Sequence, residues 1–248
     1  DTKVNTVMKV RVAKQGNDNI IIGSDYNGVV LASDYSGNIL WRTDVGNGTM
    51  NHDLWCDDID ADGKQEVFAA NANGSIVCLD LKGNIRWTFT PYDGVHRTPM
   101  YSVCVVKSNN KPYVVCGDFS TDCYYLDALT GKLVQKLPSK NYSKAKVFKI
   151  DKKYNFQHIA NFLRPIPLDK GNDLLLMHGS NNHMQSSGEF YVIEPLKNKV
   201  LSHVVKPLKQ RGTIGDVRVV DPDGDGTYEV IFGSSVLNGN EFGRIEFS

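Results

Sequence analysis

The feature that most restricts the fold of this chain is a repeat that returns from residue 28 to residue 74, an offset of 46 residues. Residues 28–41 (GVVLASDYSGNILW) align without a gap with residues 74–87 (GSIVCLDLKGNIRW). A third copy occupies residues 124–133, and a looser fourth copy occupies residues 190–201. A fixed period of this length indicates one small structural unit whose copies stack and bury one another's apolar faces.

The internal pattern of the repeat identifies that unit. Residues 53–89 contain four short apolar runs separated by turn signals such as Asn73-Gly74 and Lys82-Gly83-Asn84. Such runs predict a four-stranded antiparallel meander. A period in the forties with four strands per repeat is typical of β-propeller blades. We therefore predict an all-β chain with the fold of a β-propeller.

Five blades are expected, at residues 7–43, 54–89, 101–137, 163–204 and 217–247. The fifth has three apolar runs, so a closed ring of five blades lacks a strand. We predict that residues 1–248 form a single propeller domain or propeller fragment, part of a ring of about seven or eight blades. The remainder would lie on the same chain or on another one. Trp41 and Trp87 share a face with Ile39 and Ile85, and we expect them to pack between blades.

A basic insertion interrupts the repeat at residues 138–164. It contains six lysines between Lys140 and Lys153 and a single acid, Asp151. Its two alternating runs, residues 145–150 and 154–160, are compatible with a hairpin. A solvated arm and a basic lip over a site for an anionic ligand are both open interpretations.

The composition excludes several classes of function. The 28 Lys and Arg residues balance the 28 Asp and Glu residues, which argues against a nucleic-acid partner and against a membrane-surface binder. No apolar run approaches the roughly 18 residues needed for a transmembrane segment. The five cysteines form no CxxC pair, and we expect buried thiols, although one disulfide is possible.

Two acidic loops carry the clearest motif in the chain. Three aspartates alternate, a glycine follows the third, and a glutamate stands at the ninth position. Alternate carboxylates in a tight loop, with the carbonyl of the seventh residue, offer the oxygen ligands that Ca²⁺ prefers. The predicted ligands of two structural calcium sites are Asp58, Asp60, Asp62, Lys64 and Glu66, and Asp221, Asp223, Asp225, Thr227 and Glu229. Merely acidic turns are the alternative.

These motifs resemble known propeller families. The acidic loops are similar to FG-GAP or VCBS repeats, and the repeated turn from Asp to Gly, followed by a tryptophan in the first two blades, resembles pyrroloquinoline-quinone-type propeller repeats. Asp53 and Asp216 each stand five residues before the first aspartate of a loop, an arrangement similar to that of rhamnogalacturonan lyase propellers. The resemblance implies the fold and a carbohydrate-active protein. Because propellers host many functions, the fold alone implies no activity.

The candidate ligand site lies where the first strands of the blades begin, at the end opposite the acidic loops. Histidines and arginines recur there in different blades and would converge near one axis. The predicted catalytic residues are His52, His96, Arg97, Arg164 and Arg211. The predicted substrate-binding residues are Asp53, Asn181, His183 and Asp216.

Two functions fit this set of residues. A polysaccharide lyase for a uronate-containing glycan would use an arginine to neutralise the carboxylate and a histidine as base. A non-catalytic module would bind glycan or protein through the same face. A quinone-dependent dehydrogenase is a distant third, because the chain has no vicinal cysteine pair. Calcium at extracellular concentration fills sites of modest affinity, so we expect a secreted, periplasmic or cell-surface protein.

Overall fold

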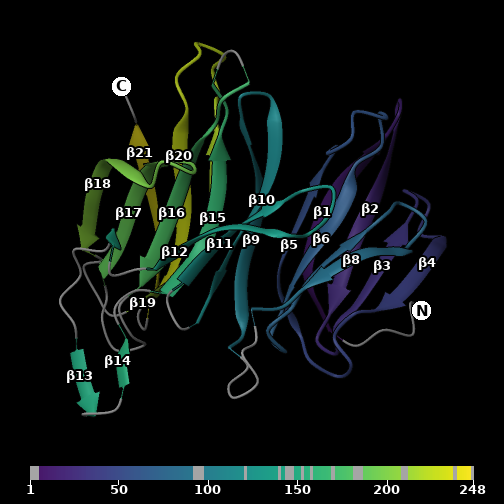
Figure 1. The fold of residues 1–248 in the computed structure, drawn as a ribbon, viewed down its shortest axis with the longest axis horizontal. Helices are drawn as coiled ribbons and strands as arrows, with labels where there is room; N and C mark the ends of the chain where they lie inside the picture. Colours follow the sequence, from purple (N-terminus) through teal and green to yellow (C-terminus); the bar gives the residue numbers. More distant parts are fainter. Residues whose placement is uncertain are drawn as a thin grey trace. The chain divides into compact units, whose positions relative to one another are not determined.

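The described part of the chain folds into five antiparallel β-sheets of three or four strands that follow one another in sequence, and a separate two-stranded sheet lies between the third and the fourth along the chain (Figure 1). The computed structural model describes residues 6–91, 98–119, 122–138, 141–142, 148–151, 154–156, 159–168, 171–180, 187–207, 212–236 and 239–246. The regular elements of this part of the chain are β-strands. Among the described residues, no helix is long and apolar enough to span a membrane.

Each sheet is a meander in which consecutive strands pair. The first contains β1 (Val7–Gln15), β2 (Asp18–Asp25), β3 (Val29–Ser33) and β4 (Ile39–Asp44). The second contains β5 (Asn51–Asp57), β6 (Glu66–Asn71), β7 (Ile76–Leu79) and β8 (Ile85–Phe89). The third contains β9 (Met100–Ser108), β10 (Lys111–Asp118), β11 (Asp122–Asp127) and β12 (Leu133–Pro138). The fourth contains β15 (Ile159–Ile166), β16 (Leu174–Ser180), β17 (Ser187–Glu194) and β18 (Lys199–Pro207), and the fifth contains β19 (Gly212–Val220), β20 (Glu229–Val236) and β21 (Gly239–Glu246).

These sheets are the predicted propeller blades, and the last has three strands, as the sequence indicates. The chain is thus a partial propeller made of blades. The size of a complete ring stays a prediction.

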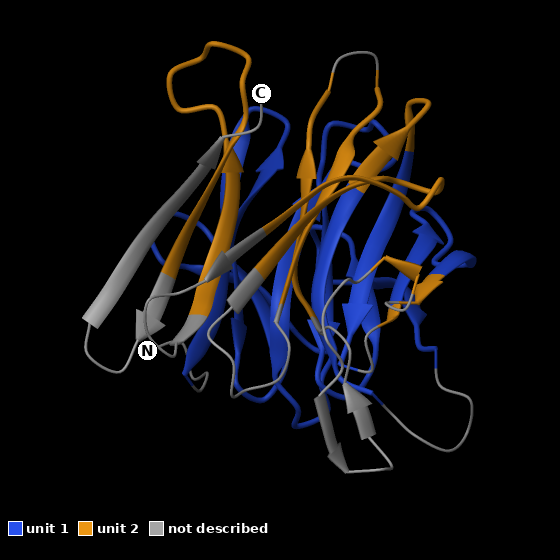
Figure 2. Cartoon of the chain, turned by 90° about the vertical axis from the view of Figure 1, so that its left-hand side faces the viewer, with its two compact units in different colours: residues 1–105, 112–119, 123–136 blue, residues 106–111, 120–122, 137–248 orange. Residues whose placement is uncertain are grey.

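The chain divides into two compact units (Figure 2). One comprises residues 1–105, 112–119 and 123–136, and the other comprises residues 106–111, 120–122 and 137–248.

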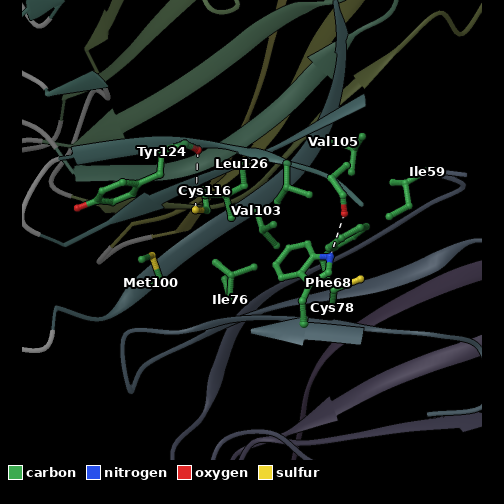
Figure 3. Packing of buried hydrophobic residues seen from close by; sticks show 14 residues of the cluster. Ile59, Phe68, Ile76, Cys78, Met100, Val103, Val105, Cys116, Tyr124 and Leu126 are labelled. Atoms are coloured by element: carbon green, nitrogen blue, oxygen red, sulfur yellow. Dashed lines mark hydrogen bonds between the residues drawn. The ribbon is translucent and has the colours of Figure 1, made fainter. Parts of the chain in front are cut away.

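The core of the first unit lies between neighbouring blades. Buried side chains of β6, β7 and β8, including Phe68 and Ile76, pack against buried side chains of β9 to β11, such as Val103 and Leu126 (Figure 3). A second cluster joins the first two sheets through residues that include Ile22 and Leu54. Successive side chains of a strand point to opposite faces of the sheet, so each blade supplies buried apolar side chains to both of its faces.

Tryptophans fix the spacing between these blades, as predicted. The indole Nε1 of Trp41 donates to the Leu81 carbonyl at 2.7 Å, and that of Trp87 donates to the Ala128 carbonyl at 2.9 Å. A Cβ at Gly83 or Gly131 would lie 2.8 Å or 2.6 Å from the respective indole ring. Both glycines also have a positive φ, so the turn requires a residue without a side chain. The repeated Trp of one blade therefore packs against the repeated Gly of the next blade.

The second unit has an equivalent core. Phe190 of β17 lies 5.2 Å from Phe232 of β20, measured between ring centroids, and β15 contacts β19. The basic insertion contains the predicted hairpin, formed by β13 (Phe148–Asp151) and β14 (Tyr154–Phe156). Its predicted end at residue 164 is too late, because β15 begins at Ile159 and continues the blade pattern.

The five cysteines are free thiols, and four of them are buried, while Cys56 is partly exposed. The possible disulfide is therefore not formed. Burial raises the pKa of the Cys116 thiol well above its usual value, so this thiol stays protonated near neutral pH.

Candidate functional site

The first strands of neighbouring blades lie side by side in the first unit, because β1 contacts β5. The Asp53 carboxylate, only 1% exposed, joins three of these strands. Its Oδ1 accepts a hydrogen bond from Arg11 Nη2 at 2.9 Å, and its Oδ2 accepts one from the Val103 amide at 3.4 Å. The predicted substrate-binding Asp53 is therefore enclosed by groups of the protein, and we assign it to the junction of the blades.

An equivalent pair occurs in the second unit. Arg164 is 2% exposed and donates from Nε to the Val217 carbonyl at 3.0 Å and from Nη2 to Asp216 Oδ1 at 3.3 Å. Arg218 contacts the other oxygen of Asp216 at 3.0 Å. These contacts argue against the predicted meeting of Arg164 with a substrate carboxylate, since its guanidinium is buried against acceptors of the protein.

The residues around His52 remain the best candidate for a ligand site. His52 follows the first residue of β5, and its partly exposed imidazole stacks on the Tyr101 ring with centroids 4.3 Å apart and planes 11° apart. The Phe119 ring lies 5.6 Å from Tyr101 on a neighbouring segment. Lys9 of β1 is close enough to act on the charge of His52. These four partly buried side chains, the His52 cluster, lie where first strands begin and second strands end.

The backbone places His52 in this position. The pairing of β5 with β6 shifts between Asn51 and Asp53, which is a β-bulge at His52. Asn71 Nδ2 holds the start of β5 by donating to Asn51 Oδ1 and to the Thr49 carbonyl, both at 2.8 Å. Bulges redirect a side chain, and here the bulge separates His52 from the enclosed Asp53.

The environment of His52 favours a neutral imidazole. Burial lowers its pKa below the usual 6.5, and the positive charge of Lys9 lowers the pKa further, while Asp53 opposes the change. A neutral imidazole at neutral pH is able to accept a proton or a hydrogen bond. This state is compatible with the predicted role of a base, and equally with ligand binding.

Five of the predicted site residues lie outside the described part of the chain: His96, Arg97, Asn181, His183 and Arg211. Their roles stay predictions. Of the predicted ligand-face residues that are described, His52 lies beside Tyr101 and Lys9, whereas Asp53 is paired with Arg11 and Asp216 with Arg164.

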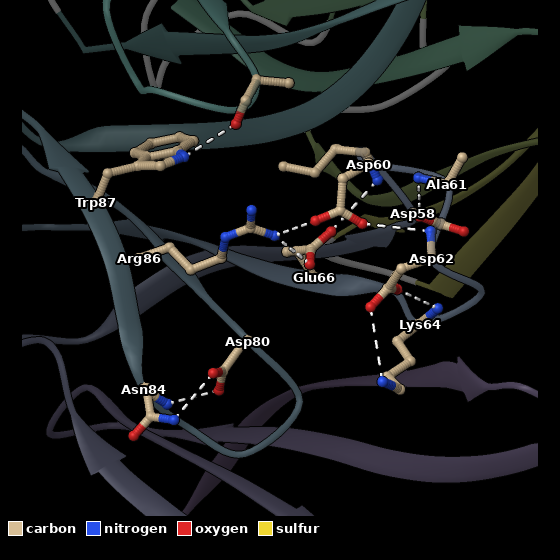
Figure 4. Close-up of polar contacts among 12 residues, drawn as sticks. Asp58, Asp60, Ala61, Asp62, Lys64, Glu66, Asp80, Asn84, Arg86 and Trp87 are labelled. Atoms are coloured by element: carbon tan, nitrogen blue, oxygen red, sulfur yellow. Dashed lines mark hydrogen bonds and ion pairs between the residues drawn. The ribbon is translucent and has the colours of Figure 1, made fainter.

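The first acidic loop connects β5 to β6, at the end of β5 opposite His52 (Figure 4). Carboxylate oxygens of Asp58, Asp60 and Glu66 lie within 4.8 Å of one another. Asp58 also accepts hydrogen bonds from the Ala61 amide at 2.7 Å and the Gly63 amide at 3.0 Å. The predicted ligand Asp62 lies outside this group, and its Oδ2 is 3.6 Å from the Lys64 ammonium group.

An arginine reaches into this loop. Arg86 Nη1 lies 2.9 Å from Asp60 Oδ2 and 2.5 Å from Glu66 Oε1. Burial raises the pKa of Glu66, and the charge of Arg86 opposes that rise. Burial alone would lower the pKa of Arg86, yet hydrogen bonds and charges from Asp60 and Glu66 raise it.

The second acidic loop, which connects β19 to β20, has the same backbone pattern. Asp221 accepts hydrogen bonds from the Gly224 amide at 2.8 Å and the Gly226 amide at 3.0 Å. The carboxylates of Asp221, Asp223 and Asp225 lie within 4.8 Å of one another, without the predicted Glu229. The Thr227 amide donates to Asp225 Oδ1 at 2.7 Å, and the role of the Thr227 carbonyl as a ligand stays a prediction. Oxygen donors of this number and type suit Ca²⁺.

The first acidic loop also touches the preceding blade. The Gly16 amide donates to the Gly63 carbonyl at 2.8 Å, and the Gln65 amide donates to the Lys14 carbonyl at 3.0 Å. Any ligand that orders this loop would therefore stiffen the junction between the first two blades.

Sequence reasoning missed three participants in these arrangements. Arg11 and Tyr101 are brought to Asp53 and His52 by the stacking of blades, and no local motif marks them. Arg86 could have been noticed from the sequence, because it departs from the repeat. The equivalent residue of the first blade is the apolar Leu40.

Comparison with known proteins provides the family. The model of the lambda-carrageenase β-propeller domain matches residues 20–247. Two curated relatives, both named lambda-carrageenase, come from Pseudoalteromonas sp and Pseudoalteromonas carrageenovora. Each is 37% identical over 236 residues, which cover 95% of this chain and 24% of the relative. The chain thus spans about a quarter of the length of these relatives.

Solved structures show the same fold at low sequence identity. The WD40 domain of Neurospora crassa Pan2 matches with a TM-score of 0.62 and 10% identity, covering 98% of this chain and 63% of that one. The WD40 β-propeller domain of Doa1 matches with a TM-score of 0.59 and 13% identity, covering 95% of this chain and 62% of that one. Both support the propeller fold alone.

Proposed function

This chain belongs to the family of lambda-carrageenase β-propeller domains, and from that premise we propose that it binds a sulfated galactan within a larger polysaccharide-degrading protein. The similarity to lambda-carrageenases over 95% of the chain is the observation that carries the proposal. Because the chain spans 24% of those relatives, the cleavage reaction is proposed for the whole protein. A polysaccharide is too large to cross a membrane intact, so the protein would act on it outside the cytoplasm. This agrees with the expected extracytoplasmic location.

The His52 cluster is the proposed binding surface in the first unit. Aromatic rings present an apolar face with a polar edge, and such a surface suits the hydrophobic face of a sugar ring. The stacked pair of His52 and Tyr101, extended by Phe119, has these properties. Carrageenans carry sulfate esters, and Lys9 supplies a positive charge beside the rings.

The chemistry of the polymer favours hydrolysis over the lyase mechanism. A lyase requires a carboxylate that acidifies the neighbouring C–H group, and a sulfated galactan has sulfate esters in place of uronate. Hydrolysis of a glycosidic bond ordinarily uses two carboxyl groups, one as acid and one as nucleophile or base. Both oxygens of Asp53 already accept hydrogen bonds from Arg11 and Val103, so we do not assign Asp53 to this chemistry.

We further propose that calcium is a structural cofactor bound by acidic loops. Asp221, Asp223 and Asp225 offer convergent carboxylates, and the Thr227 carbonyl would be a further ligand. Calcium there would neutralise carboxylates that repel one another and order the connection from β19 to β20. The first loop has donors of the same type, but Arg86 already contacts two of them.

A panel of polymers tests the binding proposal. Affinity electrophoresis in gels containing lambda-carrageenan, agarose or polygalacturonate separates a sulfated, a neutral and a carboxylated polymer. We expect retardation by lambda-carrageenan alone, weakened by added salt because screening reduces the contribution of Lys9. Retardation by polygalacturonate alone would overturn the proposal and restore the uronate hypothesis.

The products of the full-length protein identify the reaction. New reducing ends without absorbance at 235 nm are expected for hydrolysis. Absorbance at 235 nm would instead establish an unsaturated uronate product and therefore a lyase. A protein that binds lambda-carrageenan and releases no product would be a non-catalytic binding module.

A further inference from the structure

The second strands of the first three blades end on equivalent residues, and the residue of the second blade differs from the other two. β2 ends at Asp25, β6 at Asn71 and β10 at Asp118, and all three side chains are buried. Oδ1 of Asp25 accepts the amide of Asn27 at 2.9 Å, and Oδ1 of Asn71 accepts the amide of Asn73 at 2.7 Å. An aspartate is sufficient for this turn, because the turn requires only an acceptor.

The amide group of Asn71 has a second role that a carboxylate is unable to perform. Its Nδ2 donates to the Thr49 carbonyl and to Asn51 Oδ1, both at 2.8 Å. Its Oδ1 also accepts a hydrogen bond from Thr49 Oγ1 at 2.6 Å. An ionised carboxylate only accepts hydrogen bonds. Since Asn71 is 0% exposed, an oxygen in place of Nδ2 would face two acceptors away from water, which is costly.

These contacts fix the backbone on one side of His52. Asn51 is buried and pairs with Asn71 across the strands, and the regular pairing resumes only at Asp53. On the other side of His52, the carboxylate of Asp53 is held by Arg11. The bulge that carries His52 therefore lies between two buried, hydrogen-bonded neighbours, and these neighbours determine the direction of its side chain.

We propose that Asn71 is a positioning residue of the His52 cluster: its amide group sets the start of β5 so that the imidazole of His52 stacks on Tyr101. Because Asn71 is buried, it acts through Asn51 and His52 and not by contact with a glycan. The consequence for ligand affinity rests on the sulfated-galactan binding proposed above. The positioning of His52 does not.

Two matched variants test this role. Asn71→Asp installs the residue of the first and third blades, keeps the acceptor for the turn and removes both donors. Asn73→Asp makes the same chemical change two residues away. Oδ1 of Asn73 accepts the Ser75 amide at 3.0 Å and the Ser75 hydroxyl at 2.6 Å, and a carboxylate retains both bonds.

NMR signals of the His52 imidazole protons, assigned with His52→Gln, report the stack, because the ring current of Tyr101 shields them. The spectra are recorded at about pH 8.5, where histidine is neutral and a nearby charge does not alter its protonation. We expect Asn71→Asp to move these signals toward their positions in Tyr101→Leu, and Asn73→Asp to leave them as in the wild type. If Asn71→Asp does not fold, Asn51→Ala removes the acceptor instead and should move the signals in the same direction.

The affinity for lambda-carrageenan oligosaccharides should fall about tenfold in Asn71→Asp and stay unchanged in Asn73→Asp. Unchanged His52 signals in the folded variant would overturn the proposal. So would moved signals together with wild-type affinity. Moved signals in a protein whose wild type binds no lambda-carrageenan would instead refute the binding proposal and leave the positioning role of Asn71 intact.

Discussion

Replacement of Asp53 by alanine should destabilise the protein strongly without touching the proposed ligand surface. The change leaves the Arg11 guanidinium, which is 10% exposed, without its carboxylate, and it removes an acceptor from the Val103 and Leu54 amides. Breaking a buried ion pair by removing one partner costs about 3–5 kcal/mol. For a chain of this size each kcal/mol lowers the Tm by about 2–4 °C, so a fall of about 6–20 °C is expected.

Differential scanning calorimetry measures this change, with a matched pair on the surface as control. Lys197 and Glu194 form an ion pair in which the lysine is 73% exposed. Because exposed pairs contribute about 0–1 kcal/mol, Glu194→Ala should shift the Tm by less than about 4 °C. The reasoning is refuted if Asp53→Ala keeps the Tm of the wild type and loses affinity for lambda-carrageenan, since Asp53 would then be the substrate ligand that the sequence predicts.

Three further predictions concern separate parts of the molecule. Gly131→Ala should lower the Tm more than Gly37→Ala, because both glycines have a positive φ but only at Gly131 would a Cβ collide with Trp87; equal losses would contradict the packing argument. Stability should fall as the pH drops below about 6.5, since burial depresses the folded-state pKa of His52 below its unfolded value and protonation then favours the unfolded chain; His52→Gln should flatten this dependence in a series of thermal melts. Removal of calcium by EDTA should lower the Tm, and Ca²⁺ but not Mg²⁺ should restore it; a Tm indifferent to both ions would argue against calcium in either loop.

The strands and the contacts between blades could be predicted because their signals are local or repeated. Alternating apolar residues and turn glycines define each meander within one copy of the repeat. The gapless repeat then places Trp41 and Trp87 in equivalent positions, where both donate to a carbonyl of the following blade.

The start of β5 illustrates what such signals miss. The sequence predicts that the strand begins at Leu54, yet it begins at Asn51, because Asn71 fixes its first residue and a bulge accommodates His52. Polar residues at a strand end carry no apolar pattern, so their hydrogen bonds become visible only in three dimensions.

The candidate site was predictable in position but less so in its roles. His52 and the acidic loops are recognisable from residue type and spacing. The partners of Asp53 and Asp216 are not, because Arg11 and Arg164 stand 42 and 52 residues away in sequence and belong to preceding blades. An aspartate that binds a sugar and one that joins two strands look the same in a sequence.

The affinity of lambda-carrageenan oligosaccharides, measured by titration calorimetry, tests the central claim most directly. Loss of a central aromatic contact costs about 2 kcal/mol, so Tyr101→Ala should weaken binding about 30-fold. Tyr35→Ala, which removes a tyrosine that is 67% exposed on the first blade, should bind as the wild type does. Equal affinities for Tyr101→Ala and the wild type, or no binding by the wild type, would contradict the proposal that the His52 cluster holds a sulfated galactan.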